Sequence, residues 1–167
     1  SIGSRRPHGV CSHMIGPLRR DIERGLGDIV GPSHVITDPD RLVVYESDGL
    51  TSYRVRPRAV ILPGSTNEVV EAVRLLHSSG IEVVPRGAGT GLSGGALPTP
   101  DGVVLGTARM SQILEIDPEN RLARIEPGVV NGHLTVAANR YGLYYPPDPS
   151  SQSTCTLGGN IAENSGG

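Results

Sequence analysis

A glycine-rich stretch, Pro85-Arg-Gly-Ala-Gly-Thr-Gly-Leu-Ser-Gly-Gly95, follows directly after an apolar run with Ile81, Val83 and Val84. Glycine allows positive φ, so successive backbone N–H groups can turn toward one point and form a concavity suited to phosphate oxygens. Arg86 adds a positive charge that a simple turn does not need. The stretch therefore predicts an anion-binding loop, although a glycine-rich turn after a strand can also be only a flexible connection.

The segment before this loop has the pattern of a parallel α/β unit. The β-branched run 59–62 predicts a buried strand, and 81–84 predicts a second one. Between them, Ser65 and Glu68 have capping-box spacing and Gly80 ends the helix. Strand, helix and strand in this order indicate a right-handed βαβ unit, with the loop at the carboxyl end of its second strand, where ligands of such sheets bind. An amphipathic helix from Pro17 precedes the unit.

The segment after the loop has an antiparallel character. A third short strand is expected at 103–105, and the alternating runs 113–116 and 122–125 flank a turn signal, which predicts a hairpin. Asn131 is expected to cap a helix that ends at Gly142. The fold class predicted is α+β: a small parallel βαβ subdomain followed by an antiparallel subdomain.

Composition excludes several classes of protein. The 167 residues carry a formal net charge of −2, so the chain has no bulk positive charge to attract nucleic acid or an anionic membrane, and we do not expect nucleic acid as a partner. All 15 basic residues are arginine, which excludes a Walker-type lysine loop and a Schiff-base lysine. The two cysteines and five histidines lack the spacing of a metal site, and Cys155 is expected to be a small buried residue. No apolar run is long enough to span a bilayer.

Two motif matches inside the loop point to other chemistries. Gly89, Gly91 and Gly94 satisfy G-x-G-x-x-G, the dinucleotide fingerprint of a Rossmann fold. Gly91, Ser93 and Gly95 satisfy G-x-S-x-G, the nucleophile turn of a hydrolase. Both motifs require a helix to follow directly, and Pro98 and Pro100 prevent one. A diphosphate cofactor held by irregular loops remains, and the polar stretch 148–164 offers further loop groups.

Three separated motifs resemble the FAD-binding domain of the vanillyl-alcohol-oxidase and p-cresol-methylhydroxylase superfamily. They are the glycine-rich stretch 85–95, Pro147-Asp-Pro-Ser-Ser151, and Gly158-Gly-Asn-Ile-Ala-Glu-Asn-Ser-Gly-Gly167. The chain is most similar to the group with the FAD-binding subunit of glycolate oxidase and FAD-linked D-lactate dehydrogenases. Asp48-Gly49, Tyr53 and Arg56-Pro57 also resemble the lead-in of that group. The likeness covers about 150 residues from Pro17 onward.

The resemblance implies which residues bind FAD. The pyrophosphate would be wrapped by Arg86, Gly87, Ala88, Gly89, Thr90, Gly91, Leu92, Ser93 and Gly94. The channel beside the ribityl chain and flavin ring would be lined by Pro147, Asp148, Ser150, Thr154, Gly158, Gly159, Asn160, Ala162 and Asn164. Asp148 can also be only a turn residue, and Asn160 and Asn164 can serve left-handed turns. Members with covalent flavin often carry a histidine where Thr90 stands, so non-covalent FAD is expected.

The resemblance also implies a domain division and a reaction. Residues 1–14 are expected to be a disordered leader or an expression remnant, 15–106 a first FAD-binding subdomain, and 107–167 the start of a second, with the substrate domain absent. The reaction implied is oxidation of a small 2-hydroxy acid by hydride transfer to the flavin. The residues do not identify a catalytic base, a metal ligand or the electron acceptor.

Further expectations concern partners and location. An incomplete second subdomain leaves strand edges and apolar surface uncovered, so we expect self-association or a partner subunit. The implied location is the cytoplasm or a membrane periphery. A non-catalytic FAD- or nucleotide-binding module that needs another chain for activity is the alternative function.

Overall fold

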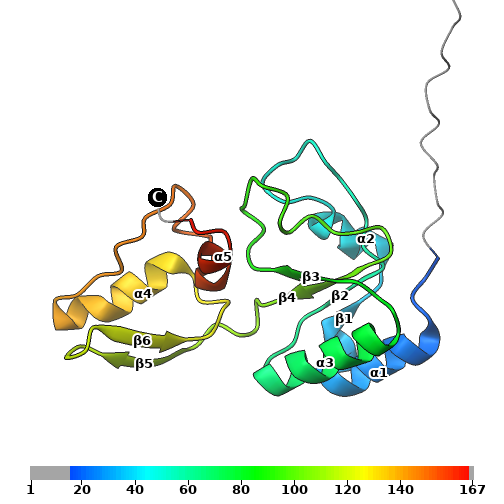
Figure 1. Cartoon of the computed structure of the whole chain (residues 1–167), viewed down its shortest axis with the longest axis horizontal. Coiled ribbons are helices and arrows are strands. Elements are labelled where there is room, and N and C mark those ends of the chain that lie inside the picture. Colours follow the sequence, from blue (N-terminus) through cyan, green and yellow to red (C-terminus); the bar gives the residue numbers. More distant parts are fainter. Residues whose placement is uncertain (1–15, 166–167) are drawn as a thin grey trace, which may run out of the picture.

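The computed structural model describes residues 16–165 and forms two lobes, which we call the first lobe (16–106) and the second lobe (107–165) (Figure 1). The predicted leader 1–14 lies outside the described residues, as do Gly166 and Gly167 of the second glycine stretch. In the first lobe the elements are α1 (Arg20–Val30), β1 (Val35–Ile36), α2 (Pro39–Leu42), β2 (Ala59–Ile61), α3 (Thr66–Ser78), β3 (Val83–Arg86) and β4 (Val103–Gly106). In the second lobe they are β5 (Ile113–Asp117), β6 (Leu122–Ile125), α4 (Asn131–Ala138) and α5 (Leu157–Ala162).

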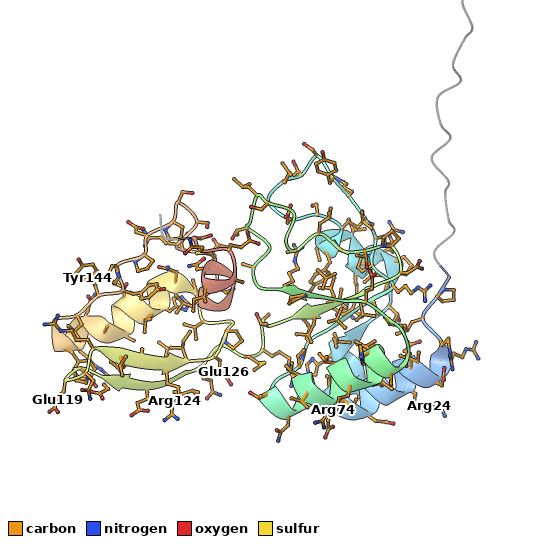
Figure 2. The ribbon with its side chains drawn as sticks, viewed as in Figure 1. Arg24, Arg74, Glu119, Arg124, Glu126 and Tyr144 are labelled. Atoms are coloured by element: carbon orange, nitrogen blue, oxygen red, sulfur yellow. The ribbon has the colours of Figure 1, made fainter. Side chains whose placement is uncertain are left out.

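The first lobe is a four-stranded sheet between two helical layers. The strand order is β1-β2-β4-β3, in which β2, β4 and β3 are parallel and β1 is antiparallel to β2. α1 and α3 cover one face, where Leu26 and Leu76 are fully buried against Ile61. The other face packs Val60 and Val104 against Leu42 of α2. Charged side chains such as Arg24 and Arg74 lie on the outer side of α1 and α3 (Figure 2).

The predicted strand–helix–strand unit is confirmed, but its two strands are not neighbours. β4, which follows the glycine-rich stretch, lies between β2 and β3 and pairs with both. Within the unit, the Ser65 hydroxyl accepts a hydrogen bond from the Glu68 N–H at 3.2 Å. Gly80, with a φ of +69°, follows the end of α3. The capping signals therefore act as predicted, while the order of strands depends on long-range packing.

In the second lobe the alternating runs form the predicted antiparallel hairpin β5–β6, which packs against α4 (Figure 1). The prediction of Asn131 as a helix cap is wrong. Val130 is the cap, and Asn131 is the first helical residue, 1% exposed, whose amide donates to the Pro147 carbonyl at 3.1 Å. Asn131 therefore anchors the segment that leads to α5. The predicted boundary at residue 106 lies between the two sheets, and its status as a subdomain boundary stays a prediction.

Candidate cofactor-binding site

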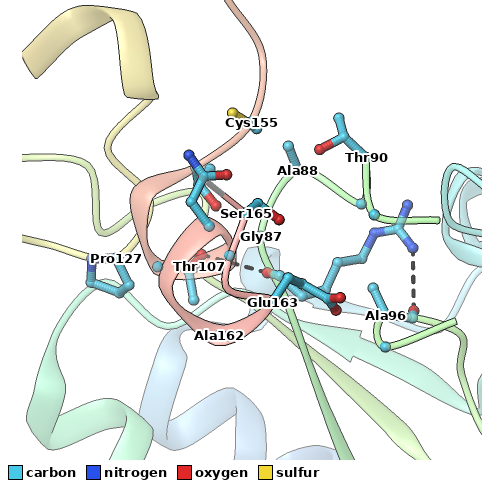
Figure 3. Close-up of a pocket in the computed structure, with 18 of the residues that line it drawn as sticks. Gly87, Ala88, Thr90, Ala96, Thr107, Pro127, Cys155, Ala162, Glu163 and Ser165 are labelled. Carbon is cyan, nitrogen blue, oxygen red and sulfur yellow. Dashed lines mark hydrogen bonds between the residues drawn. The ribbon is translucent and has the colours of Figure 1, made fainter. Parts of the chain in front are cut away.

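A cavity of about 320 Å³ lies between the glycine loop, which we define as residues 87–96, and α5 with the chain on either side of it (Figure 3). The loop begins where β3 ends, and Thr107 at the end of β4 also lines the cavity. Pro127, just after β6, lines it from the second lobe. The carboxyl ends of two neighbouring parallel strands therefore open onto this cavity, as expected for a ligand site of an open α/β sheet.

The glycine loop carries a run of unpaired backbone donors. Within residues 16–165, none of the N–H groups from residue 87 to residue 96 donates a hydrogen bond. Buried or half-buried N–H groups normally find a partner in protein or water. Residues 87–91 and 95–96 of this loop line the cavity, so their free donors lie at its edge. Such an arrangement suits the oxygens of a phosphate group.

Two buried polar side chains on the opposite wall also lack partners. Thr156 is 7% exposed and Asn160 is 6% exposed, and both line the cavity. The Thr156 Oγ1 and the Asn160 Nδ2 are buried with no hydrogen-bond partner. A Cβ at Gly87 would overlap the Thr156 hydroxyl, so the two walls meet here only because residue 87 is glycine. These side chains offer a donor and a hydroxyl to a polar ligand.

Arg86 is placed differently from what the sequence suggested. We expected its charge at the mouth of the loop, but its guanidinium is held by backbone carbonyls. Nη1 donates to Ser47 O at 2.7 Å and to Ala96 O at 3.4 Å, and the bond to Ala96 is drawn in Figure 3. Burial lowers the pKa of Arg86, while the nearby Asp48 and Tyr45 act in the opposite direction.

The structure brings ten of the predicted FAD-binding residues to the cavity. They are Arg86, Gly87, Ala88, Gly89, Thr90, Gly91, Gly158, Gly159, Asn160 and Ala162. The predicted residues that do not line it are Leu92, Ser93, Gly94, Pro147, Asp148, Ser150, Thr154 and Asn164.

The residues outside the cavity have other surroundings. Leu92 is 70% exposed at the tip of the loop, and Asp148 is exposed. Asn164 has a φ of +53°, so the left-handed turn considered for it is present, whereas Asn160 lies within α5.

Sequence reasoning missed several lining residues. They are Pro85, Gly95, Ala96, Thr107, Pro127, Pro149, Ser151, Cys155, Thr156, Glu163 and Ser165. Thr156 had a usable signal, since a threonine two residues before Gly158-Gly159 is placed to precede a helix. Thr107 and Pro127 had none, because Thr107 reaches the cavity through the pairing of β4 with β3, and Pro127 reaches it through the packing of the two lobes. Cys155 is buried, as expected.

The site suits a group that carries phosphate and polar edges. The glycine loop supplies N–H donors, the small residues 158, 159 and 162 permit close approach of a flat ring, and Thr156 and Asn160 supply unpaired polar atoms. The cavity volume lies near the lower end for ligand pockets, so it accommodates part of an extended dinucleotide. In residues 16–165 no helix is long and apolar enough to cross a membrane.

Comparison with known proteins is consistent with this geometry. A family model described as "FAD binding domain" matches residues 57–167. Glycolate oxidase subunit GlcD of Escherichia coli is 45% identical over 149 residues, which cover 89% of this chain and 30% of that protein. D-lactate dehydrogenase of Archaeoglobus fulgidus is 45% identical over 118 residues, 68% of this chain and 26% of that protein. The chain therefore spans about 30% of the length of the curated relatives it matches.

Solved structures show the same fold. Alkyldihydroxyacetonephosphate synthase matches with a TM-score of 0.79 at 24% identity, covering 90% of this chain and 30% of that one. The 4-ethylphenol oxidase from Gulosibacter chungangensis matches with a TM-score of 0.73 at 29% identity, over 84% of this chain and 28% of that one. p-Cresol methylhydroxylase also matches, with a TM-score of 0.73 at 23% identity, over 84% of this chain and 28% of that one. The chain belongs to the FAD binding domain family, with the fold of the vanillyl-alcohol-oxidase and p-cresol-methylhydroxylase flavoenzymes.

Proposed function

We propose that this chain is the FAD-holding part of a flavin-dependent oxidoreductase that acts on a small 2-hydroxy acid, with the FAD bound non-covalently. The observation that carries the proposal is the run of unpaired N–H groups from 87 to 96 beside the unpaired Thr156 and Asn160 side chains. The substrate class rests on the relatives, which are named as a glycolate oxidase subunit, a D-lactate dehydrogenase and a D-2-hydroxyglutarate dehydrogenase.

Each part of the site has a task in this proposal. The N–H groups of the glycine loop would hold the diphosphate, and Thr156 and Asn160 would hydrogen-bond polar groups of the cofactor on the facing wall. The glycine loop has Thr90 and no histidine, so it offers no histidine side chain for a covalent bond to the flavin. When bound, the flavin supplies a two-electron acceptor for oxidation of the 2-hydroxy acid to the 2-oxo acid, with the α-hydrogen leaving as hydride and the hydroxyl proton going to a base.

Cofactor binding is tested by titrating the purified chain with FAD and, separately, with riboflavin, and following flavin fluorescence. Because the diphosphate lies in FAD and not in riboflavin, we expect FAD to bind at least tenfold more tightly. Thr156→Val removes the unpaired hydroxyl and should weaken FAD binding about fivefold. Thr66→Val is the matched control, since Thr66 is exposed on α3 and outside the cavity. A folded chain with no affinity for FAD would refute the proposal.

The reaction needs a separate test. We expect glycolate or D-lactate to bleach the flavin absorbance of the FAD-loaded chain under anaerobic conditions. A second candidate function is a non-catalytic FAD-binding module that needs another chain, and the observation in its favour is that no histidine, lysine or tyrosine lines the described cavity to act as a base. FAD binding without bleaching by any 2-hydroxy acid would favour this second function. The partner would then be a separate subunit, as the name of the Escherichia coli relative suggests for that protein.

A further inference from the structure

The Arg86 guanidinium ties together backbone segments that are far apart in the sequence. Besides its bonds to Ser47 O and Ala96 O, its Nη2 lies 3.5 Å from Val44 O. Ala96 is the last residue of the glycine loop, and Arg86 is the residue just before its first. One side chain therefore closes the loop on itself and attaches it to the segment 44–47.

The surroundings of Arg86 make this position tolerable for a charge. The residue is 9% exposed, and placing a guanidinium there costs free energy unless its N–H groups are paired. The Tyr45 ring centroid lies 5.6 Å from Arg86 Cζ, a favourable cation–π distance. Asp48 is 5% exposed, and its Oδ1 accepts the Leu50 N–H at 2.8 Å while its carboxylate attracts Arg86. The site is therefore built for a buried guanidinium.

The shape of the loop depends on the same group. Gly89 has a φ of +72°, and a Cβ there would overlap the Arg86 guanidinium. The loop thus passes directly over the side chain that starts it. Gly94 has a similar φ of +78°, but nothing lies within 4 Å of a Cβ built there. In the cofactor-free loop, the two glycines therefore separate the effect of a positive φ from the effect of contact with Arg86.

We propose that Arg86 is a positioning residue, which holds the glycine loop in the curved form that presents its unpaired N–H groups, and is not the direct counter-charge of a bound diphosphate. This inference rests on the proposed function, because it assigns a role within the same cofactor site. Preorganised donors bind an anion more tightly than donors that must first be ordered.

The test compares Arg86→Met with Arg109→Met. Arg109 is the matched control, because its Nη1 also donates to backbone carbonyls, to Leu62 O at 2.7 Å and Val30 O at 3.3 Å, but outside the cavity. We expect backbone ¹⁵N order parameters of residues 88–95 in the cofactor-free chain to fall from about 0.85 to below about 0.6 in Arg86→Met only. FAD affinity should fall about tenfold, while its salt dependence stays that of the wild type.

The opposite result would overturn the inference: unchanged loop order parameters in Arg86→Met, with FAD affinity that has become less dependent on salt. That outcome would indicate that the Arg86 guanidinium contacts the diphosphate of FAD directly. If Arg86→Met does not fold, the order parameters of the cofactor-free loop should fall more in Gly89→Ala than in Gly94→Ala, and equal changes would refute the role. Absence of FAD binding by the wild type would refute the proposed function instead, while the order parameters would still test the placement of Arg86.

Discussion

Three glycines of the glycine loop each lie against a different polar side chain. Gly87 gives room to the Thr156 hydroxyl, Gly89 to the Arg86 guanidinium, and Gly95 to the Glu163 carboxylate. In the sequence these glycines look equivalent, as a source of backbone freedom. In the structure, each permits contact with a different polar side chain. A substitution at each position should therefore disturb a different part of the site.

Glu163 gives the first prediction at this scale. Its side chain lines the cavity and approaches the loop at Gly91 and Gly95, so a negative charge lies beside the proposed diphosphate site. Glu163→Gln removes the repulsion and should tighten FAD binding about fivefold, or about 1 kcal/mol, at low ionic strength. Fluorescence titration measures the change. Glu119→Gln is the control, because Glu119 lies at the tip of the β5–β6 hairpin, away from the cavity (Figure 2). Weaker FAD binding by Glu163→Gln would contradict this prediction and would indicate that the carboxylate accepts a hydrogen bond from a cofactor hydroxyl.

At the scale of elements, local signals predicted most of the fold. The capping residues of α3 and the turn between β5 and β6 act through neighbours in sequence, and both are where the sequence placed them. Two features depend on distant packing and were not predicted. The insertion of β4 between β2 and β3 is one, and the buried amide of Asn131 bound to Pro147 O is the other.

The candidate site divides in the same way. Much of the glycine loop could be found from its own motif, because its glycines and its position directly after a strand are both visible in the local sequence. The facing wall was found only in part: in the segment 147–154, Pro149 and Ser151 line the cavity, and the four residues named from the sequence do not. Arg86 shows the limit most clearly. Its charge suggested a residue that binds the anion, and only its hydrogen bonds to Val44, Ser47 and Ala96 indicate a residue that supports the glycine loop.

The β5–β6 turn gives a prediction at this scale. The Asn120 side chain donates to Asp117 Oδ2 at 2.7 Å and its backbone N–H to Oδ1 at 3.0 Å, and these bonds lower the pKa of Asp117. A lowered pKa in the folded state means that the stabilisation is present above the unfolded pKa and is lost as pH falls through the folded value. Carboxyl ¹³C titration should find the pKa of Asp117 below that of an ordinary aspartate, and Asn120→Ala should raise it. Asn139→Ala should leave it unchanged, and an unaltered value in Asn120→Ala would contradict the assignment.

At the scale of the whole molecule, the two lobes differ in how well they are covered. The first lobe has helices on both faces of its sheet, whereas the second has a two-stranded hairpin with α4 and the short α5, and a groove of about 570 Å³. Leu122, Tyr144 and Ile161 line this groove and are 65%, 69% and 72% exposed. Exposed apolar side chains clustered in this way mark a surface that favours contact with another polypeptide.

The prediction at this scale is self-association of the chain, measured by sedimentation equilibrium over a range of concentrations. Leu122→Ser with Ile161→Ser should weaken the association at least tenfold, because burial of each side chain contributes about 1.5–3 kcal/mol. Val44→Ser is the control, since Val44 is 69% exposed but belongs to the first lobe. A chain that remains monomeric at the highest concentration, or a loss of association in the control alone, would contradict the prediction.

The position of β4 has a consequence for how the chain acquires its structure during synthesis. β2 and β3 emerge from the ribosome first, but each takes β4 as its parallel partner, and β4 emerges only after the glycine loop. Until the loop and β4 have been made, β3 has no partner strand and β2 has only β1, which slows folding and exposes strand edges to aggregation. The glycine loop, which would bind the diphosphate in the folded chain, therefore also determines when the sheet of the first lobe can be completed during synthesis.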